Sequence, residues 1–281
     1  MYQYLFNEKK WTEIKDCSFH LSYFIHGVFE INKNCFVFGK NPDNKTGILH
    51  LGAEDKFHQF SDQNILTYNA CEYKNQIFLI GKNRESRLFS PITKKWKNLN
   101  LCLDQFDFAA VEYQNQIWFL GGHCKQINNH DSLNIIEIYD PVTATQMRSP
   151  IKMITEREYA SAIAYKEKLF VFGGINDYDY ELNSVEMFTP ASNSFVMMSP
   201  MKTPRWAFGC CRVDNLVFII GGCISGSQEE TSSVEVYNLD TDQWTEGVDF
   251  PFDCSHVRAC QVKRNLFQSS KKVCDFYEGF V

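Results

Sequence analysis

The chain has 281 residues, 44% of them hydrophobic and 22% charged, a composition that excludes global disorder. Its 34 acidic and 28 basic residues give a net charge of −6, which disfavours binding to nucleic acid because phosphate recognition needs a concentrated basic surface. The 24 Phe, 13 Tyr and 5 Trp residues favour pleated, half-buried β structure.

Five segments of similar sequence follow one another along the chain. Each has a polar turn, four or five apolar residues and then a glycine, which predicts two strands joined by a tight turn and ended by the glycine. The segments are INKNCFVFGK (31–40), EYKNQIFLIGK (72–82), EYQNQIWFLGG (112–122), YKEKLFVFGG (165–174) and RVDNLVFIIGG (212–222). A sixth copy starts at QVKRNLF (261–267) but continues without the apolar end and the glycine.

A second pattern predicts two more strands in each unit, because two aromatic residues stand seven positions apart with a polar turn between them. The clearest pairs are Tyr4 and Trp11, Phe89 and Trp96, Phe188 and Phe195, and Tyr237 and Trp244. The first pair lies at the very start of the chain, where no strand–glycine segment precedes it. We expect these large rings to fill the space between neighbouring units.

Four short strands per unit, repeated every 40–50 residues or so, are typical of propeller blades. The sequence therefore predicts an all-β, six-bladed propeller that forms a single domain over residues 1–281. Five blades are expected at about 17–60, 61–102, 103–150, 151–201 and 202–250. The sixth is shared between the termini, over residues 251–281 and 1–16. Its inner strands are expected at 256–267 and its outer strands at 2–14, which closes the ring without a free sheet edge.

The glycine doublets resemble those of the kelch repeat, in which a Tyr and a Trp about seven residues apart follow the doublet. Gly121-Gly122, Gly173-Gly174 and Gly221-Gly222 match the doublet, and Gly39-Lys40 and Gly81-Lys82 keep half of it. Across its whole length the chain is most similar to the six-bladed C-terminal propeller of kelch-like proteins, where a BTB and a BACK domain precede the propeller.

The resemblance implies a function as well as a fold. It implies a non-catalytic protein-interaction module that recognises substrates for a cullin-RING ubiquitin ligase. In that family the cullin contact belongs to the BTB and BACK regions, which these 281 residues do not contain. The alternatives that the resemblance leaves open are an actin-binding kelch protein and a kelch-fold sugar-modifying enzyme.

The residues themselves show no catalytic pattern. No P-loop, GxSxG or HExxH sequence is present, and the seven His residues are scattered. His123 and His130 flank Cys124 in one long loop, which we interpret as a solvated loop and not as a metal site. We therefore expect a protein without enzyme activity, cofactor or metal.

The eleven cysteines are odd in number, scattered from Cys17 to Cys274, and often placed inside apolar runs. They lack zinc-ligand spacing, so they predict buried, reduced thiols in a cytoplasmic or nuclear protein that is not secreted. The longest apolar runs, such as Leu216–Ile220, are too short for a membrane helix, and no leader sequence is visible. We expect no membrane partner.

The candidate binding residues come from counting back from the glycine. The residue sixteen positions earlier is Tyr23, Ile65, Gln105, Arg157 or Arg205, and His256 and Arg258 lie near the corresponding place in the shared blade. The resemblance implies that this position faces the mouth of the central channel. Arg157 and Arg205 then form a fork for an acidic peptide, since guanidinium groups bind carboxylates in bidentate fashion. The alternative is that both pair with acids of their own loops, such as Glu156 or Glu158, and bind nothing.

The loops after the glycines (123–131, 176–181 and 224–231) are expected to border the same mouth. Tyr178 and Tyr180 in the second of them are aromatic anchors with a polar tip, the kind of residue that dominates interface energies. The partner-binding set is thus predicted to be Arg157, Arg205, Tyr178, Tyr180, Gln105, Tyr23, His256 and Arg258.

Overall fold

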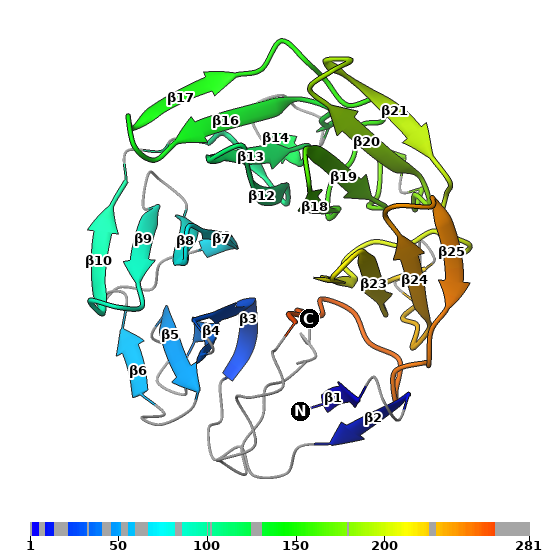
Figure 1. Ribbon diagram of the computed structural model, residues 1–281, viewed down its shortest axis with the longest axis horizontal. Coiled ribbons are helices and arrows are strands. Elements are labelled where there is room, and N and C mark those ends of the chain that lie inside the picture. Colours follow the sequence, from blue (N-terminus) through cyan, green and yellow to red (C-terminus); the bar gives the residue numbers. More distant parts are fainter. Residues whose placement is uncertain are drawn as a thin grey trace.

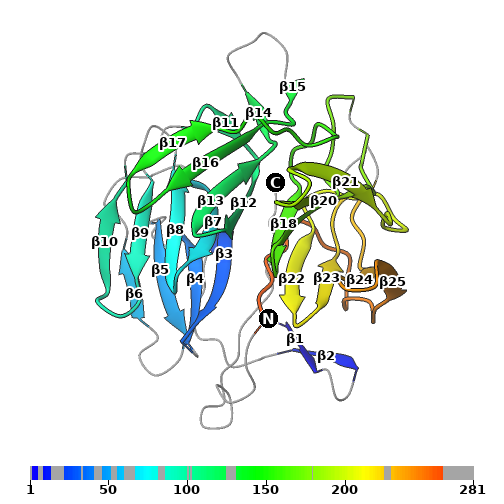
Figure 2. The same ribbon diagram turned by 45° about the horizontal axis from the view of Figure 1, so that its top comes forward.

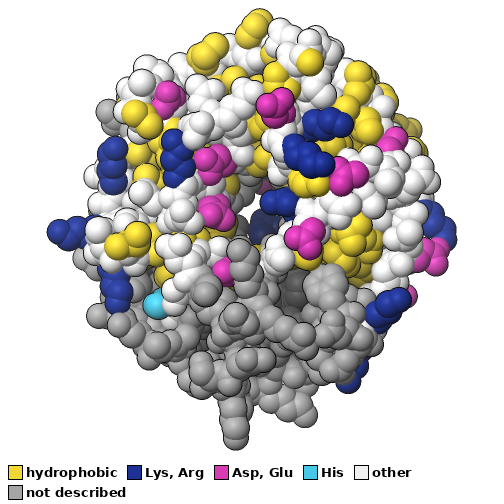
Figure 3. Space-filling model, in the orientation of Figure 1, with side chains coloured by type: hydrophobic (Ala, Val, Ile, Leu, Met, Phe, Trp, Pro, Cys, Tyr) yellow, Lys and Arg dark blue, Asp and Glu magenta, His cyan; other side chains and the backbone are white. Residues whose placement is uncertain are grey.

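The computed structural model describes residues 2–5, 9–13, 22–32, 34–40, 46–51, 56–59, 67–81, 86–99, 101, 103–124, 131–178, 180–224 and 229–261. Antiparallel sheets stand side by side in a ring (Figure 1). The space-filling view shows an opening at the centre of this ring, bordered by acidic and basic side chains (Figure 3). Within the described residues no helix is long and apolar enough to cross a membrane.

Five four-stranded sheets make up most of the ring, and we number them blades 1 to 5 in chain order. Blade 1 contains β3 (Ser22–Ile31), β4 (Asn34–Lys40), β5 (Thr46–Leu51) and β6 (Lys56–Gln59). Blade 2 contains β7 (Thr67–Tyr73), β8 (Gln76–Gly81), β9 (Arg87–Ser90) and β10 (Lys95–Asn98). Blade 3 contains β12 (Ala109–Tyr113), β13 (Gln116–Leu120), β16 (Ile136–Asp140) and β17 (Thr145–Arg148). Blade 4 contains β18 (Ser161–Tyr165), β19 (Lys168–Phe172), β20 (Val185–Thr189) and β21 (Ser194–Met198). Blade 5 contains β22 (Gly209–Val213), β23 (Leu216–Ile220), β24 (Val234–Asn238) and β25 (Gln243–Glu246).

The strand pairs predicted from the aromatic pattern are confirmed. Tyr237 faces Trp244 across β24 and β25, and Phe188 faces Phe195 across β20 and β21. The rings pack between blades: Phe172 of blade 4 lies 5.6 Å from Tyr237 of blade 5, measured between ring centroids. Apolar side chains from adjoining blades therefore pack together to form the core. Each Å² of apolar surface that this packing removes from water stabilises the fold by about 25 cal/mol.

The propeller is confirmed, but the number of blades is not the predicted six. The described residues form five four-stranded blades, and in the gap between blades 5 and 1 lies a two-stranded sheet of β1 (Tyr2–Leu5) and β2 (Lys10–Glu13) (Figure 1). Tyr4 faces Trp11 in this sheet, in the register of the outer strands of the blades. Residues 256–261, predicted to begin the inner strands here, form no strand, and 262–267 lie outside the described residues.

The first glycine doublet leads into a small additional sheet, whose β14 and β15 extend beyond the ends of the blade strands (Figure 2). It consists of β11 (Gln105–Phe106), β14 (His123–Cys124) and β15 (Asp131–Ser132). The glycine is required by close approach of the backbone. Gly122 has a φ of +87°, and a Cβ atom there would lie 2.2 Å from the carbonyl oxygen of Phe106.

Candidate functional site

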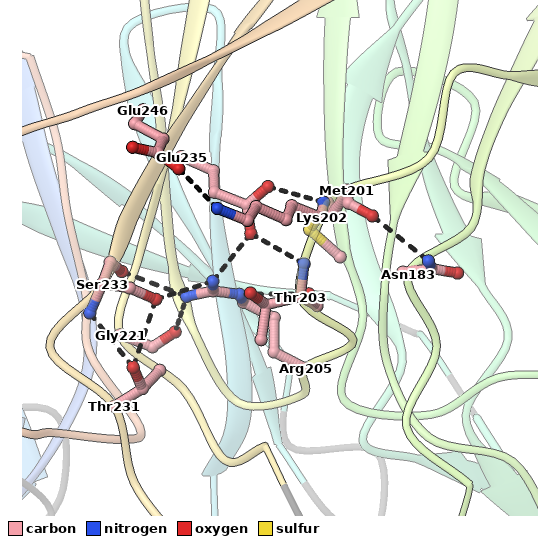
Figure 4. Close-up of polar contacts among 10 residues, drawn as sticks. All are labelled: Asn183, Met201, Lys202, Thr203, Arg205, Gly221, Thr231, Ser233, Glu235 and Glu246. Carbon is pink, nitrogen blue, oxygen red and sulfur yellow. Dashed lines mark hydrogen bonds and ion pairs between the residues drawn. The ribbon is translucent and has the colours of Figure 1, made fainter.

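Arg205 is the best-connected side chain of the predicted binding set (Figure 4). It comes just before β22 and is fully buried, with 0% of its side chain exposed. Nη1 donates to the carbonyl oxygens of Gly221 (2.7 Å) and Ser233 (3.1 Å), and Nη2 donates to Ser233 Oγ (2.8 Å) and Glu235 Oε1 (2.8 Å). The carboxylate of Glu235 also accepts hydrogen bonds from the backbone amides of Lys202 and Thr203, so this buried ion pair is closely surrounded by partners.

Arg157 repeats this arrangement one blade earlier. Its Nη1 donates to Gly173 O at 2.7 Å, and its Nη2 lies 3.1 Å from Ser184 Oγ and 2.5 Å from Glu186 Oε1. The side chains of Arg157 and Glu186 are both completely buried. Burial lowers the pKa of the Arg157 guanidinium, and the neighbouring Glu186 carboxylate opposes that effect.

These contacts correct the prediction that the two arginines form a fork at the channel mouth. A guanidinium with no exposed surface cannot reach a partner, and each one is already paired. The alternative of an internal ion pair is right in kind, but the acids are Glu186 and Glu235 on β20 and β24, not Glu156 or Glu158. The arginines are therefore structural residues. The backbone carbonyl of Arg157 also accepts a hydrogen bond from the amide of Gly122, and that of Arg205 accepts one from the amide of Gly174. Both glycines belong to the glycine doublet of the preceding blade.

Gln105 occupies the same register in blade 3 and is also buried, at 4% exposure. Its Nε2 has no hydrogen-bond partner among the described residues, and Glu137, which matches Glu186 and Glu235, pairs instead with Arg148. In the next position around the ring the structure places Cys254, whose carbonyl accepts from Gly222 as Arg205 accepts from Gly174. The register therefore continues to Cys254 and not to His256 or Arg258.

A different position of the repeat, two residues after Gln105, Arg157 and Arg205, shares one backbone conformation. Asp107, Tyr159, Ala207 and His256 all have left-handed backbones, with φ between 51° and 53°. The amide of each of the last three donates to the carbonyl of the one before it, at 2.8, 3.3 and 2.6 Å. This chain of hydrogen bonds joins consecutive blades close to the ring axis.

Three aromatic rings meet there, and we call Tyr159, Trp206 and His256 the mouth cluster. The ring centroid of Trp206 lies 5.1 Å from that of Tyr159 and 5.9 Å from that of His256. Tyr159 also approaches His256 at 6.4 Å, although the two residues stand two blades apart. Such an approach is possible only near the axis. The indole Nε1 of Trp206 is buried and has no hydrogen-bond partner among the described residues.

A charged group adjoins the mouth cluster, and we call Asp107, His123 and Glu158 the Asp–His–Glu cluster. His123 Nδ1 lies 2.5 Å from Glu158 Oε2 and 3.4 Å from Asp107 Oδ2, with 10%, 19% and 25% of the His, Glu and Asp side chains exposed. Desolvation raises the pKa of Glu158, and the carboxylates of Asp107 and Asp177 add to that effect while His123 opposes it.

Tyr178 and Tyr180 are exposed, as an interface role requires, at 78% and 66%. The side-chain oxygen of Asn176 accepts hydrogen bonds from the amides of both residues at 3.1 Å, which fixes the turn that presents them. Asp177, next to Tyr178, accepts a hydrogen bond through Oδ1 from the backbone amide of Ser132. This bond joins the loop of blade 4 to β15. The two phenol rings are therefore displayed on an anchored loop.

The remaining predicted residues have different surroundings. His256 is exposed, and its Nδ1 lies 3.0 Å from Ser255 Oγ, which donates to Glu230. Partial desolvation and the nearby Arg258 lower the pKa of His256. Arg258 is half-buried and interacts electrostatically with Asp107. Tyr23 lies in β3, and its side chain is outside the described residues.

Sequence reasoning missed Asp107, Glu158, Tyr159 and Trp206. A signal was available, because Asp107, Tyr159 and Ala207 each lie fourteen residues before the first glycine of a doublet. The position chosen from the sequence was two residues earlier, and it proves to be the buried one.

Known proteins resemble this chain in sequence and in fold. Residues 107–266 match the family described as the KLHDC2/KLHL20/DRC7 Kelch-repeats domain. Kelch-like protein 26 of Danio rerio is 25% identical over 61% of this chain and 29% of its own length. Kelch-like protein 36 of Bos taurus is 26% identical over 68% of this chain and 33% of its own length. Kelch repeat and BTB domain-containing protein 12 of Danio rerio is 21% identical over 82% of this chain and 36% of its own length.

The chain therefore spans about a third of the length of these curated relatives. A solved structure, titled "Structure of YjhT", superposes with a TM-score of 0.62 at 11% identity and covers 71% of both chains. That similarity shows the fold alone.

Proposed function

Because the chain belongs to the kelch-repeat family, we propose that it is a protein-interaction module that binds a partner at the channel mouth. The exposed Tyr178 and Tyr180 carry this proposal, on a loop whose Asp177 lies close to Glu158, since aromatic residues with polar tips are enriched at the energetic centres of interfaces. Kelch-like relatives support a protein partner in general terms.

The charge at this mouth suggests which kind of peptide it takes. The acidic peptide expected from the sequence depended on Arg157 and Arg205, and both residues are buried and cannot contact it. The carboxylates of Asp107, Glu158 and Glu230 lie beside the aromatic rings instead, with Arg258 as a neighbouring cation. We propose a peptide segment that offers a basic or hydrogen-bond-donating side chain to these carboxylates, because complementary charge steers and selects partners.

Peptide selection tests this proposal. A displayed random-peptide library is selected on the immobilised protein, and the peptides obtained are titrated against Tyr178→Ser/Tyr180→Ser. We expect enrichment of Lys or Arg and a loss of affinity of at least about tenfold in the variant. The matched control is Val142→Ser/Met147→Ser, which changes two exposed apolar residues on blade 3. Acidic peptides that bind both variants and the unchanged protein equally well contradict the proposal.

We further propose that this module selects substrates for a cullin-RING ubiquitin ligase. The name of one relative includes a BTB domain, and in kelch-like proteins that region contacts the cullin. The experiment is immunoprecipitation of the endogenous gene product, followed by detection of cullin and of ubiquitinated partners. A product that co-precipitates no cullin, and whose partners do not accumulate when cullin activation is blocked, refutes the ligase role without affecting the peptide-binding result.

A further inference from the structure

The Asp–His–Glu cluster is absent from the equivalent positions of the other blade junctions. His123 follows the glycine doublet of blade 3, and the same place holds Ile175 in blade 4 and Cys223 in blade 5. Their bridge partners are equivalent as well: Phe106 pairs with His123, Glu158 with Ile175, and Trp206 with Cys223. The propeller fold therefore does not require a His or an acid at these positions.

The three residues come together only across the junction between blades 3 and 4. Asp107 and His123 lie at β11 and β14, whereas Glu158 precedes β18. Their candidate ligand atoms all lie within 4.8 Å of one another. In a tetrahedral site with metal–ligand bonds of about 2.1 Å, ligand atoms are about 3.4 Å apart. The Nδ1–Oδ2 distance of 3.4 Å already meets this value, and the Nδ1–Oε2 contact of 2.5 Å has to open by about 1 Å.

The electrostatic surroundings favour a cation. Asp177 adds a third carboxylate beside Glu158, so a single imidazole is set among several acids in a partly desolvated place. The hydroxyl group of Tyr159 hydrogen-bonds to Asp107, and outer partners of this kind hold a ligating carboxylate in position. The side chains keep 10–25% of their surface exposed, which leaves an ion a path from the solvent.

We propose that Asp107, His123 and Glu158 form a binding site for a divalent first-row transition metal ion that links blades 3 and 4. Two carboxylate oxygens and one imidazole nitrogen are ligands that Zn²⁺, Mn²⁺ and Fe²⁺ accept, and water completes the coordination sphere. The blade 4 loop lies close to the site, because its Asp177 interacts with Glu158 and accepts a hydrogen bond from Ser132 of β15. The site does not depend on the identity of any peptide partner.

Manganese is the suitable first probe, because the eleven thiols of this chain bind soft metals and hold Mn²⁺ poorly. Free Mn²⁺ is measured by its EPR signal during titration of the full chain, and Zn²⁺ is then added as a competitor. We expect one saturable Mn²⁺ site per chain and displacement by Zn²⁺, which binds such ligands more tightly. Binding should weaken as the solution is acidified, because protons compete with the metal ion for its ligands.

Variants assign the site. His123→Ala and Asp107→Asn should each weaken Mn²⁺ binding by at least about tenfold, and Tyr159→Phe by about tenfold through the position of Asp107. Glu246→Gln, which removes an exposed carboxylate on β25 outside the cluster, is the matched control and should bind as the unchanged protein does. Melting curves without metal show which variants fold, and the nearly isosteric Asp107→Asn remains informative where His123→Ala does not fold. The proposal is overturned if no saturable site tighter than about 1 mM exists, or if the folded cluster variants bind Mn²⁺ as well as Glu246→Gln does.

Discussion

Replacement of Arg205 by Met should destabilise the propeller by about 3–5 kcal/mol, because it leaves the Glu235 carboxylate buried without its cation. The carbonyl of Gly221 and the hydroxyl of Ser233 each lose a hydrogen bond from the guanidinium at the same time. At roughly 2–4 °C for each kcal/mol in a protein of this size, the melting temperature should fall by about 6–20 °C. Differential scanning calorimetry on the purified variant measures that fall.

Two further variants separate charge burial from lost packing. Arg205→Met/Glu235→Gln removes both charges and keeps one of the two oxygens that accept from the amides of Lys202 and Thr203, so part of the loss should be recovered. Lys166→Met is the surface control: both partners of its ion pair with Asp240 are exposed, so its melting temperature should stay close to that of the unchanged protein. If Arg205→Met melts within about 2 °C of the unchanged protein, the reasoning that places this ion pair in the core is wrong.

Three other predictions concern ring closure, thiol reactivity and pH. Deletion of residues 1–13 removes β1 and β2, and with them Trp11, whose indole donates to Val248 O at 2.8 Å and packs on the ring of Phe250 at 5.0 Å. The melting temperature should therefore fall by at least about 5 °C. An unchanged melting temperature refutes a role of these strands in ring closure. Burial raises the pKa of the Cys211 thiol to about 12 and that of the Cys71 thiol further. Because the thiolate is the reactive form, alkylation of these two residues at pH 8 should be at least about tenfold slower in the native protein than in urea. Equal rates in the two states contradict their burial. The pKa of His256 in the folded protein lies below its ordinary value of 6.5, so protonation favours the unfolded chain and stability should fall as the pH drops below 6.5. His256→Gln should reduce that fall in stability. An identical dependence of stability on pH in this variant excludes His256 as the cause.

The repeat made the blades predictable from sequence. A hairpin, a glycine stop and an aromatic pair recur in phase, and each is local chemistry that a strand or a turn requires, as at Tyr237 and Trp244. The sixth blade was less predictable, because the C-terminal segment lacks the glycine and holds Cys254 where blades 4 and 5 have an arginine.

The burial of Arg157 and Arg205 could not be predicted in the same way. Their acids lie 29 and 30 residues further along the chain, across a loop whose length differs from blade to blade. An arginine near a loop is consistent with a solvated or a buried position until its carboxylate is located. The Asp–His–Glu cluster was hidden for a similar reason: its members are distant in sequence and meet across a blade junction.

The choice of the wrong register has a specific physical origin. In a regular strand, residues two apart point to the same side, so Arg157 and Tyr159 would share a face. Tyr159 instead has a φ of 51°, and this left-handed residue ends the alternation just before β18 begins. Arg157 therefore turns into the blade while Tyr159 turns to the axis, where it meets Trp206 and His256. The same left-handed conformation recurs at Asp107 and Ala207, so the backbone reverses the alternation at the same place in three consecutive units.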